Sequence, residues 1–324
     1  MKGIEFDTIL DLFGGTGSVS YGFKSLGKEV VYNDVLTSNY HIGRALIENN
    51  QTKIGTQEIN DLFSTREEIQ YDNLVSRVFA GIYFTDEENS LIDTIAQNIA
   101  LMEDEIMQSM AYFCLFQSLI MKRPYNLFHR ANLYMRTAEV ERNFGNKATW
   151  EKPLRVAFEE VAENLNKGVF DNGRANRALN LDCHNVEYHP DLVYLDTPYI
   201  NARGTGVDYR DFYHFLDGIC DYQGWEEKID FNSKHRRLLP IKSPWSDPKQ
   251  ILGQFHSIFD RYSDSTIVVS YRSSGIPEIS ELKRQLERHK KFVSVSYKEG
   301  YQYALSPNKA NDEVLLIGSN ARHI

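Results

Sequence analysis

The chain has few of the features that mark secreted, membrane-spanning and metal-binding proteins. Its 324 residues include three cysteines, Cys114, Cys183 and Cys220, which are odd in number, widely spaced and without a metal-ligand pattern. No apolar run is long enough to span a membrane, and Met1-Lys-Gly-Ile leads directly into a strand-like segment without a signal peptide. We therefore expect a reduced, metal-free, cytoplasmic protein.

Two common nucleotide-binding signatures are also incomplete. The turn Phe13-Gly-Gly15-Thr-Gly17 follows a short apolar strand and precedes a helical pattern. It lacks the third glycine of a dinucleotide-binding fingerprint and the Gly-Lys-Ser/Thr ending of a P-loop. Its glycines still allow a tight turn and close approach of a ligand to the backbone, and the following helix N-terminus adds a partial positive charge. The turn predicts a ligand site and leaves the ligand open.

An acid ends the next predicted strand. Glu29-Val-Val-Tyr32 runs into Asn33-Asp34, and Asp34 lies 17 residues beyond Gly17. An acid at the tip of the second strand of a βαβ unit is placed to bind ribose hydroxyls. The alternative is a helix cap or a turn acid, and the spacing favours the ligand role.

The most informative segment is Leu192-Val-Tyr-Leu-Asp196-Thr-Pro-Tyr199, in which an apolar strand ends in an acid, a proline and an aromatic ring. Asp196 and the carbonyl of Pro198 can accept hydrogen bonds from an exocyclic amine. Tyr199 can stack on the ring that carries that amine. The plainer interpretation is a buried strand that closes with a turn, because Asp and Pro are common turn residues.

Together these segments resemble the DNA adenine-N6 methyltransferases of the Dam-like D12 class. In that class Phe-x-Gly-x-Gly binds S-adenosylmethionine, and Asp-Pro-Pro-Tyr binds the target adenine. The first motif stands here as Phe13–Gly17 and the second as Asp196–Tyr199. Thr197 departs from the second motif but leaves in place every group with an assigned chemical role.

The resemblance implies a role for each site residue. On the cofactor side, Asp11 holds the methionine ammonium, Phe13 packs on the cofactor, and Gly15 and Gly17 let it approach. Asp34 binds the ribose, and Asp182, in Leu181-Asp-Cys183, contacts the cofactor adenine.

On the catalytic side, Asp196 and the Pro198 carbonyl would accept the N–H groups of N6 and localise its lone pair. Positioning in line with the sulfonium methyl would supply much of the rate acceleration. The target base must be flipped out of double-stranded DNA, and Tyr199 would stack on it there.

The resemblance also implies an α/β fold, a Rossmann-like methyltransferase sheet closed by a β-hairpin. Residues 266–271 look like the strand after the catalytic one, and 292–297 and 312–317 look like the hairpin. The long insertion between the two motifs is predicted to be a mostly helical target-recognition domain.

We place the catalytic domain at 1–54 and 176–324 and the target-recognition domain at 55–175. Thr85-Asp-Glu-Glu88 is a plausible capping box, and two apolar patterns of helical spacing follow it and end near Lys122. A second insertion, 217–253, carries Lys-His-Arg-Arg, which indicates a basic surface loop or a lining of the DNA cleft.

Charge is distributed unevenly within a net value of −9. Residues 56–106 hold twelve acids and two bases, which predicts a solvated helical region or a face for a protein partner. Residues 122–155 hold eight bases and three acids, with aromatic residues between them. Such a run is typical of phosphate contacts and base stacking, or of an ordinary solvated surface. Its bases are Lys122, Arg123, Arg130, Arg136, Arg142, Lys147, Lys152 and Arg155, and its aromatic residues are Tyr125, Phe128, Tyr134, Phe144 and Trp150.

One departure from the family concerns the cofactor pocket. The class usually carries a basic, glycine-containing motif before the glycine turn, and ten residues precede Asp11. Another segment or a partner then closes the pocket, or cofactor binding is weak. Cytosine-N4 methylation, RNA or protein glutamine methylation, and a cofactor-deficient DNA-recognition subunit are the rival functions. Asp196 favours adenine, because cytosine enzymes usually have Ser and glutamine enzymes Asn at this position.

Overall fold

The computed structural model describes residues 4–138, 147–201, 204–206, 208–298 and 312–321. In these ranges no helix is both long and apolar enough to cross a membrane. Their internal contacts divide the chain into two compact units, which are described separately below. The first unit comprises Met1–Val35, Asn172–Asp208 and Ile241–Ile324, and the second comprises Leu36–Asp171 and Tyr209–Pro240.

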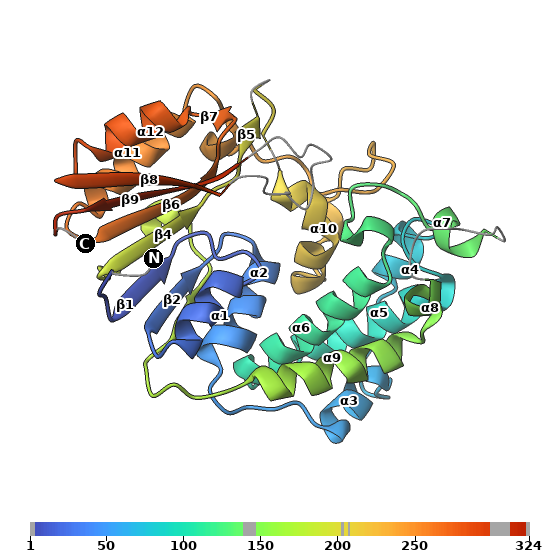
Figure 1. Cartoon of the computed structure of the whole chain (residues 1–324). Helices are drawn as coiled ribbons and strands as arrows, with labels where there is room; N and C mark the ends of the chain where they lie inside the picture. Colours follow the sequence, from blue (N-terminus) through green and yellow to red (C-terminus); the bar gives the residue numbers. More distant parts are fainter. Residues whose placement is uncertain (1–3, 139–146, 202–203, 207, 299–311, 322–324) are drawn as a thin grey trace. The chain divides into compact units, whose positions relative to one another are not determined.

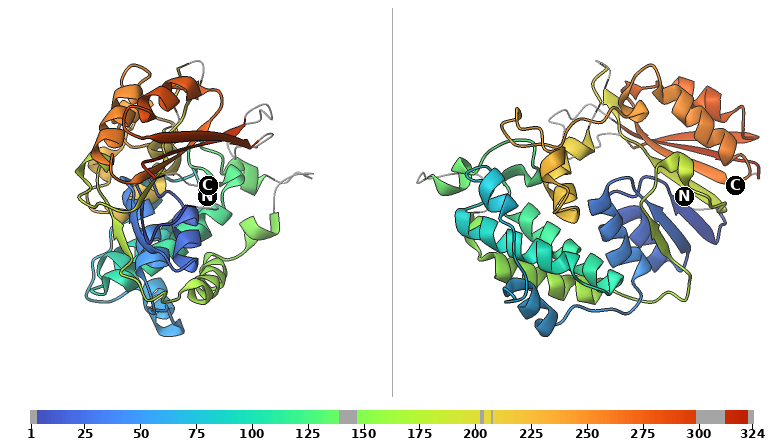
Figure 2. Two further views of the ribbon diagram at one scale, coloured as in Figure 1. Left: turned by 60° about the vertical axis from the view of Figure 1, so that its left-hand side comes forward. Right: turned by 180° about the vertical axis from the view of Figure 1, so that it is seen from behind.

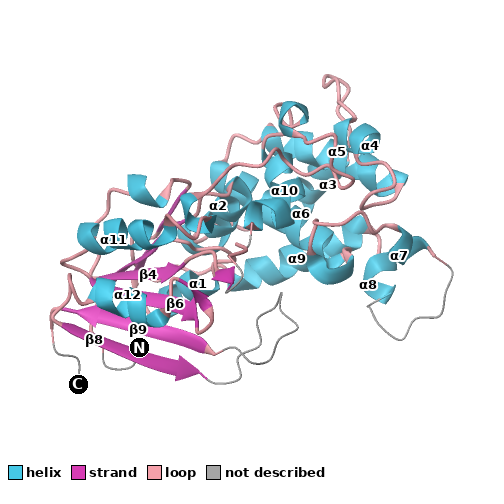
Figure 3. Ribbon diagram, turned by 90° about the horizontal axis from the view of Figure 1, so that it is seen from above, coloured by secondary structure: helices cyan, strands magenta, loops and turns pink. Residues whose placement is uncertain are grey.

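The first unit is built on a seven-stranded sheet with the order β3-β2-β1-β4-β6-β9-β8 (Figures 1 and 3). Neighbouring strands from β3 to β6 are parallel, and β9 is antiparallel to both β6 and β8. The predicted α/β class and the closing hairpin are confirmed. The strands are β1 (Thr8–Asp11), β2 (Glu29–Asn33), β3 (Arg177–Leu179), β4 (Leu192–Asp196), β6 (Thr266–Arg272), β8 (Phe292–Lys298) and β9 (Glu313–Ser319).

Helices cover both faces of this sheet (Figure 1). Alternate strand residues such as Leu10, Val193 and Val269 pack with apolar residues of α11 (Ile251–Arg261) and α12 (Ile279–Leu286). Helix α1 (Ser18–Ser25) lies on the opposite face against β1 and β2. Burial on both faces explains why the parallel strands are continuous apolar runs. A two-stranded antiparallel pair, β5 (Ile200–Asn201) with β7 (Gly275–Ile276), and two 3₁₀ turns, Cys183–Asn185 and Pro244–Ser246, complete the unit.

In the described residues of the second unit the named elements are all helices, and one isolated antiparallel bridge joins Ile229 and Leu238 (Figure 2). The predicted capping box is present: Glu88 N donates to Thr85 Oγ1 over 3.3 Å, and Thr85 N donates to Glu88 Oε2 over 3.1 Å. The two predicted helices follow it; Met110, Tyr112 and Phe116 are buried in the core of the unit, and the other aromatic and methionine side chains of these helices pack against it partly buried. The helices are α2 (Thr37–Gly43), a π-helical turn (Arg44–Glu48), α3 (Thr56–Phe63), α4 (Leu74–Val78), α5 (Asp86–Ala100), α6 (Glu105–Met121), α7 (Tyr134–Thr137), α8 (Lys147–Glu151), α9 (Leu154–Gly168) and α10 (Tyr209–Cys220), with 3₁₀ turns at Pro124–Asn126 and Glu226–Lys228.

The boundaries of the two units differ from those expected from the sequence. Residues 36–54 and 209–240, which the sequence placed with the sheet, pack with the helices of the insertion. His41 in α2 hydrogen-bonds Ser109 in α6 over 2.9 Å, and Ser38 N donates to Asp217 in α10 over 3.0 Å. These contacts join segments more than 60 residues apart in sequence, so local patterns could not reveal them.

Candidate active site

The glycine turn takes the conformation that its sequence requires. It connects the end of β1 to the start of α1, with φ of 51° at Gly15 and 74° at Gly17. Side chains with a Cβ rarely adopt such positive φ values, so glycine is needed at both positions. Phe13 lies at the start of the turn and packs edge-on against Trp245, with 5.0 Å between ring centroids.

Asp11 is a buried carboxyl group with an unmet acceptor. Its side chain is 1% exposed, and its Oδ2 accepts a hydrogen bond of 2.7 Å from Ser20 Oγ. Its Oδ1 has no hydrogen-bond partner among the described residues. Burial raises the pKa of Asp11 to about 7; the Ser20 hydrogen bond opposes the rise, and the charges of Asp196 and Asp34 add to it. A group of this kind is suited to receive a cation.

Asp34 holds the glycine turn in place. Its Oδ2 accepts a hydrogen bond of 2.9 Å from Gly15 N, and Tyr32 at the end of β2 donates its hydroxyl to Gly15 O over 2.7 Å. The contact fixes the turn from the tip of the next strand. Its predicted role toward a ribose stays a prediction.

Asn33 is a residue that the sequence reasoning missed. Its Nδ2 donates to the carbonyls of Leu12 and Leu181, each over 3.1 Å, and its Oδ1 accepts from Leu181 N over 3.1 Å. It therefore ties the segment after β1 to the segment that carries Asp182. Its position at the end of the buried strand β2, directly before Asp34, was the available signal.

Asp182 begins the 3₁₀ turn Cys183–Asn185, where its Oδ1 accepts a hydrogen bond of 2.9 Å from His184 N. Ligand atoms of Asp182, Cys183 and His184 lie within 4.8 Å of one another, the distance that a metal site needs. Burial raises the pKa of the Cys183 thiol to about 12, and His184 Nε2 is bonded to Gln254 over 2.7 Å. Cys183 Sγ also lies 3.8 Å from Asp182 Oδ1, so all three side chains make hydrogen bonds within the protein.

Asp196 and Tyr199 contact each other at the end of β4. The Tyr199 hydroxyl donates a hydrogen bond of 2.7 Å to Asp196 Oδ1, and the Tyr199 ring meets Tyr271 edge-on at 5.5 Å. Pro198, between them, is half-buried. Residue Asp196 is exposed, but desolvation of its carboxyl group by the surrounding protein raises the pKa to about 6. The hydrogen bond from Tyr199 lowers this pKa, and the charge of Glu313 raises it.

The predicted site residues follow the ends of four adjacent strands. Asp11 ends β1 and the glycine turn follows it, Asp34 follows β2, Asp182 follows β3, and Asp196 ends β4. These are the carboxyl ends of parallel strands, where open α/β sheets bind ligands. The charges of Asp34 and Asp196 both raise the pKa of Asp11, which reflects this proximity.

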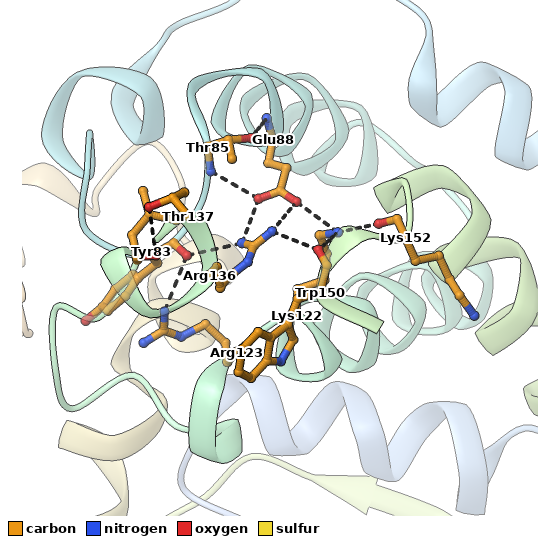
Figure 4. A network of polar contacts seen from close by, with 10 residues as sticks. Tyr83, Thr85, Glu88, Lys122, Arg123, Arg136, Thr137, Trp150 and Lys152 are labelled. Carbon is orange, nitrogen blue, oxygen red and sulfur yellow. Dashed lines mark hydrogen bonds and ion pairs between the residues drawn. The ribbon is translucent and has the colours of Figure 1, made fainter. Parts of the chain in front are cut away.

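The basic and aromatic run of the second unit requires a correction. Lys122 Nζ and Arg136 Nη2 lie 2.9 Å and 2.7 Å from Glu88 Oε1, and both cationic side chains are almost fully buried (Figure 4). Arg123 lies over the Tyr83 ring, 4.3 Å from its centroid. The prediction of phosphate contacts is therefore wrong for these three bases.

Two of the aromatic residues are internal as well. Phe128 and Trp150 are buried, whereas Tyr125, Arg130 and Tyr134 are exposed. Lys147 is also exposed, and Lys152 and Arg155 are half-buried. Arg142 and Phe144 lie outside the described residues.

Comparison with known proteins identifies related sequences. Residues 3–221 match the family described as D12 class N6 adenine-specific DNA methyltransferase. The chain is 26% identical over 300 residues to the type II methyltransferase M2.HphI of Haemophilus parahaemolyticus, a match that covers 90% of this chain and 84% of the relative. It is 26% identical to M.FokI of Planomicrobium okeanokoites, covering 86% of this chain and 42% of the relative. It is 25% identical to M.NlaIII of Neisseria lactamica, covering 87% and 80%.

Proposed function

Because this chain belongs to the D12 class of N6 adenine-specific DNA methyltransferases, we propose that it transfers the methyl group of S-adenosylmethionine to N6 of an adenine flipped out of double-stranded DNA. The observation that carries the proposal is the grouping of Asp11, Asp34 and Asp196 around one glycine turn at the ends of adjacent strands. Asp196 in place of Ser or Asn favours adenine N6 over the rival amines.

The residues on the cofactor side fit S-adenosylmethionine. The buried Oδ1 of Asp11, which has no partner among the described residues, suits the methionine ammonium. Gly15 and Gly17 keep the turn open to close approach, Phe13 packs on the cofactor, Asp34 binds the ribose, and Asp182 binds the adenine amine. When bound, the cofactor supplies an electrophilic methyl group on a sulfonium.

On the target side, Asp196 and the carbonyl of Pro198 accept the two N–H bonds of N6. Tyr199 already donates to Asp196 Oδ1, so Oδ2 is the oxygen that receives the amine. These acceptors localise the lone pair of N6 and aim it, and such positioning supplies much of the acceleration. The Tyr199 ring stacks on the flipped base, and Tyr271 supports that ring from its edge.

For DNA recognition, we propose the helical second unit as the target-recognition domain. Tyr125, Arg130 and Tyr134 are its exposed candidates for stacking and phosphate contacts. The acidic segment 56–106 is proposed as a face for a protein partner. The relatives named type II methyltransferases suggest a modification enzyme of a restriction system.

The test is direct. Purified protein is incubated with S-adenosylmethionine and unmethylated genomic DNA, and the digested nucleosides are analysed by mass spectrometry. We expect N6-methyladenine from the wild type and from Asp264→Asn, a control at an exposed carboxylate, but not from Asp196→Asn. N4-methylcytosine would overturn the base assignment. No methylated nucleoside and no cofactor binding by calorimetry would favour a recognition subunit that needs a partner.

A further inference from the structure

A second carboxylate approaches Asp196 from the antiparallel side of the sheet. Asp196 and Ser270 are register partners on the parallel strands β4 and β6. Strand β9 runs the other way, so its first residue, Glu313, pairs with Arg272 at the carboxyl end of β6. Because β9 is antiparallel, its first residue, Glu313, lies at the same end of the sheet as Asp196.

Ser270 holds the second carboxylate from the strand next to the one that carries Asp196. Its side chain is buried at 6% exposure, and its hydroxyl donates a hydrogen bond to Glu313 Oε1. The charge of Glu313 contributes to the raised pKa of Asp196. Both acids also act on the buried phenol of Tyr194, whose pKa is raised mainly by burial and lowered by the Ser270 hydroxyl. The pair is therefore electrostatically coupled across two strands.

We propose that Glu313, held by Ser270, is a positioning residue of the methyl transfer that acts through Asp196. Its charge keeps Asp196 a strong hydrogen-bond acceptor and counters the positive charge that develops on N6. This inference rests on the proposed adenine-N6 reaction and adds to it a residue outside the two recognised motifs.

The charge balance of the reaction explains why a second negative group near Asp196 would help the transfer. The lone pair of N6 forms the bond to the methyl carbon as the electrons of the broken carbon–sulfur bond return to sulfur. N6 then carries a positive charge until one of its protons is lost to solvent. Negative groups fixed beside the amine stabilise that charge without reorganising, which is the most effective form of electrostatic catalysis.

Several titratable groups surround Asp196 and must be separated from Glu313. Tyr199 hydrogen-bonds it, while Asp11 and Tyr194 respond to its charge. Glu313→Gln removes one negative charge and keeps the shape of the side chain. Glu313→Asp keeps the charge, and Glu187→Gln is a matched control at an exposed carboxylate of the same unit.

The first readout is the pH profile of kcat with both substrates saturating. For Glu313→Gln we expect the acid limb to move down by roughly half to one pH unit, because a like charge near Asp196 is lost. We expect kcat on the plateau to fall roughly tenfold, less than the hundredfold or more typical of a directly contacting group. Glu313→Asp should keep the wild-type limb, Ser270→Ala should shift it part of the way, and Glu187→Gln should leave it unchanged.

The second readout needs neither cofactor nor DNA. The carboxyl carbon of Asp196, assigned with Asp196→Asn, is titrated by ¹³C NMR in the wild type and in Glu313→Gln. A lower Asp196 pKa in the variant supports the inference. If the pKa of Asp196 and the acid limb of kcat are both unchanged in Glu313→Gln, the inference is overturned. If kcat falls and the melting temperature falls while the pKa of Asp196 stays the same, the role of Glu313 is structural. Failure of the wild type to make N6-methyladenine would refute the proposed function separately, since this titration would still report the coupling.

Discussion

The hydroxyl of Tyr199 donates a hydrogen bond of 2.7 Å to Asp196 Oδ1. The two residues that the catalytic motif assigns to stacking and to amine recognition are therefore bonded to each other. The bond orients the carboxylate and lowers its pKa, against the larger effect of desolvation and that of Glu313. The proposed functions of the aromatic residue are thus separable, with base stacking in its ring and the hydrogen bond to Asp196 in its hydroxyl.

Replacing Tyr199 in two ways separates these functions. Tyr199→Phe keeps the ring, so we expect DNA binding to persist while the Asp196 pKa, and with it the acid limb of activity, rises. Tyr199→Ala also removes stacking worth roughly 1–3 kcal/mol, which should raise KM for DNA. Steady-state kinetics across pH would check both, with the exposed Tyr297→Phe as control. An acid limb that Tyr199→Phe does not move would show that the hydroxyl has no influence on Asp196.

Activity should depend on the ionisation of Asp196. The ionised carboxylate is a much stronger acceptor of an N–H than the protonated carboxyl group, and the pKa of Asp196 is about 6. We therefore expect kcat/KM to fall as the pH drops through about 6, the pKa of Asp196 in the ligand-free protein, and to be level above it until other groups titrate. Asp196→Asn should lose roughly a hundredfold or more in kcat and have no such limb. Single-turnover rates between pH 5 and 8 measure this, and an acid limb that persists in Asp196→Asn would assign it to another group.

The strands, and the positions of the predicted site residues at the strand ends, were predictable because their signals are local. Asp11 and Asp196 each end a short apolar run, and the turn after Asp11 carries glycines at the positive φ positions. Parallel pairing then brings such strand ends together, so the grouping of the acids followed from the fold class. Glu313 and Trp245 carry no local signal, because each meets its partner across a large sequence separation.

The burial of the basic run could not be predicted for a related reason. Lys122 and Arg136 have the composition of a DNA-binding surface, and their partner Glu88 lies 34 and 48 residues away. Composition gives the charges and not their pairing. The same limit applies to residues 209–240, whose place beside the helices depends on contacts such as that of Asp217 with Ser38.

Asp11 should make the protein less stable as the pH rises. Its folded pKa of about 7 lies above the ordinary value of 3.8, so between these values the folded state binds more protons than the unfolded state. Stability is then lost as the pH rises through this window. Asp11→Asn removes the free-energy cost of ionising this buried carboxyl group. We expect the variant to be more stable than the wild type at pH 8 by about 2–4 kcal/mol and to have nearly the same stability as the wild type at pH 4. Urea unfolding of the ligand-free proteins would measure it, and equal stabilities at pH 8 would contradict the assignment.

Cofactor binding should release a proton near neutral pH. If the methionine ammonium lies beside Asp11, it lowers the pKa of a carboxyl group that is about half protonated at pH 7. Calorimetry in buffers of different ionisation enthalpy should then detect proton release for the wild type at pH 7 and much less at pH 9. Asp11→Asn should bind S-adenosylmethionine more weakly and release none. Proton release that persists in Asp11→Asn would place the ammonium beside a different group.

The buried network around Glu88 should support stability, whereas exposed Arg130 should support DNA binding. Glu88→Gln leaves Lys122 and Arg136 without their shared anion, and breaking a buried pair of this kind costs roughly 3–5 kcal/mol. Glu87→Gln, at the exposed neighbouring position, should change stability by about 0.5 kcal/mol or less.

Arg130→Ala should leave stability nearly unchanged but weaken DNA binding and reduce its salt dependence by about one phosphate contact. Denaturant unfolding and DNA titrations at several salt concentrations distinguish the two roles. If Arg130→Ala binds DNA with the wild-type affinity and salt dependence, then Arg130 is not a phosphate contact, and the same test passes to exposed Lys147.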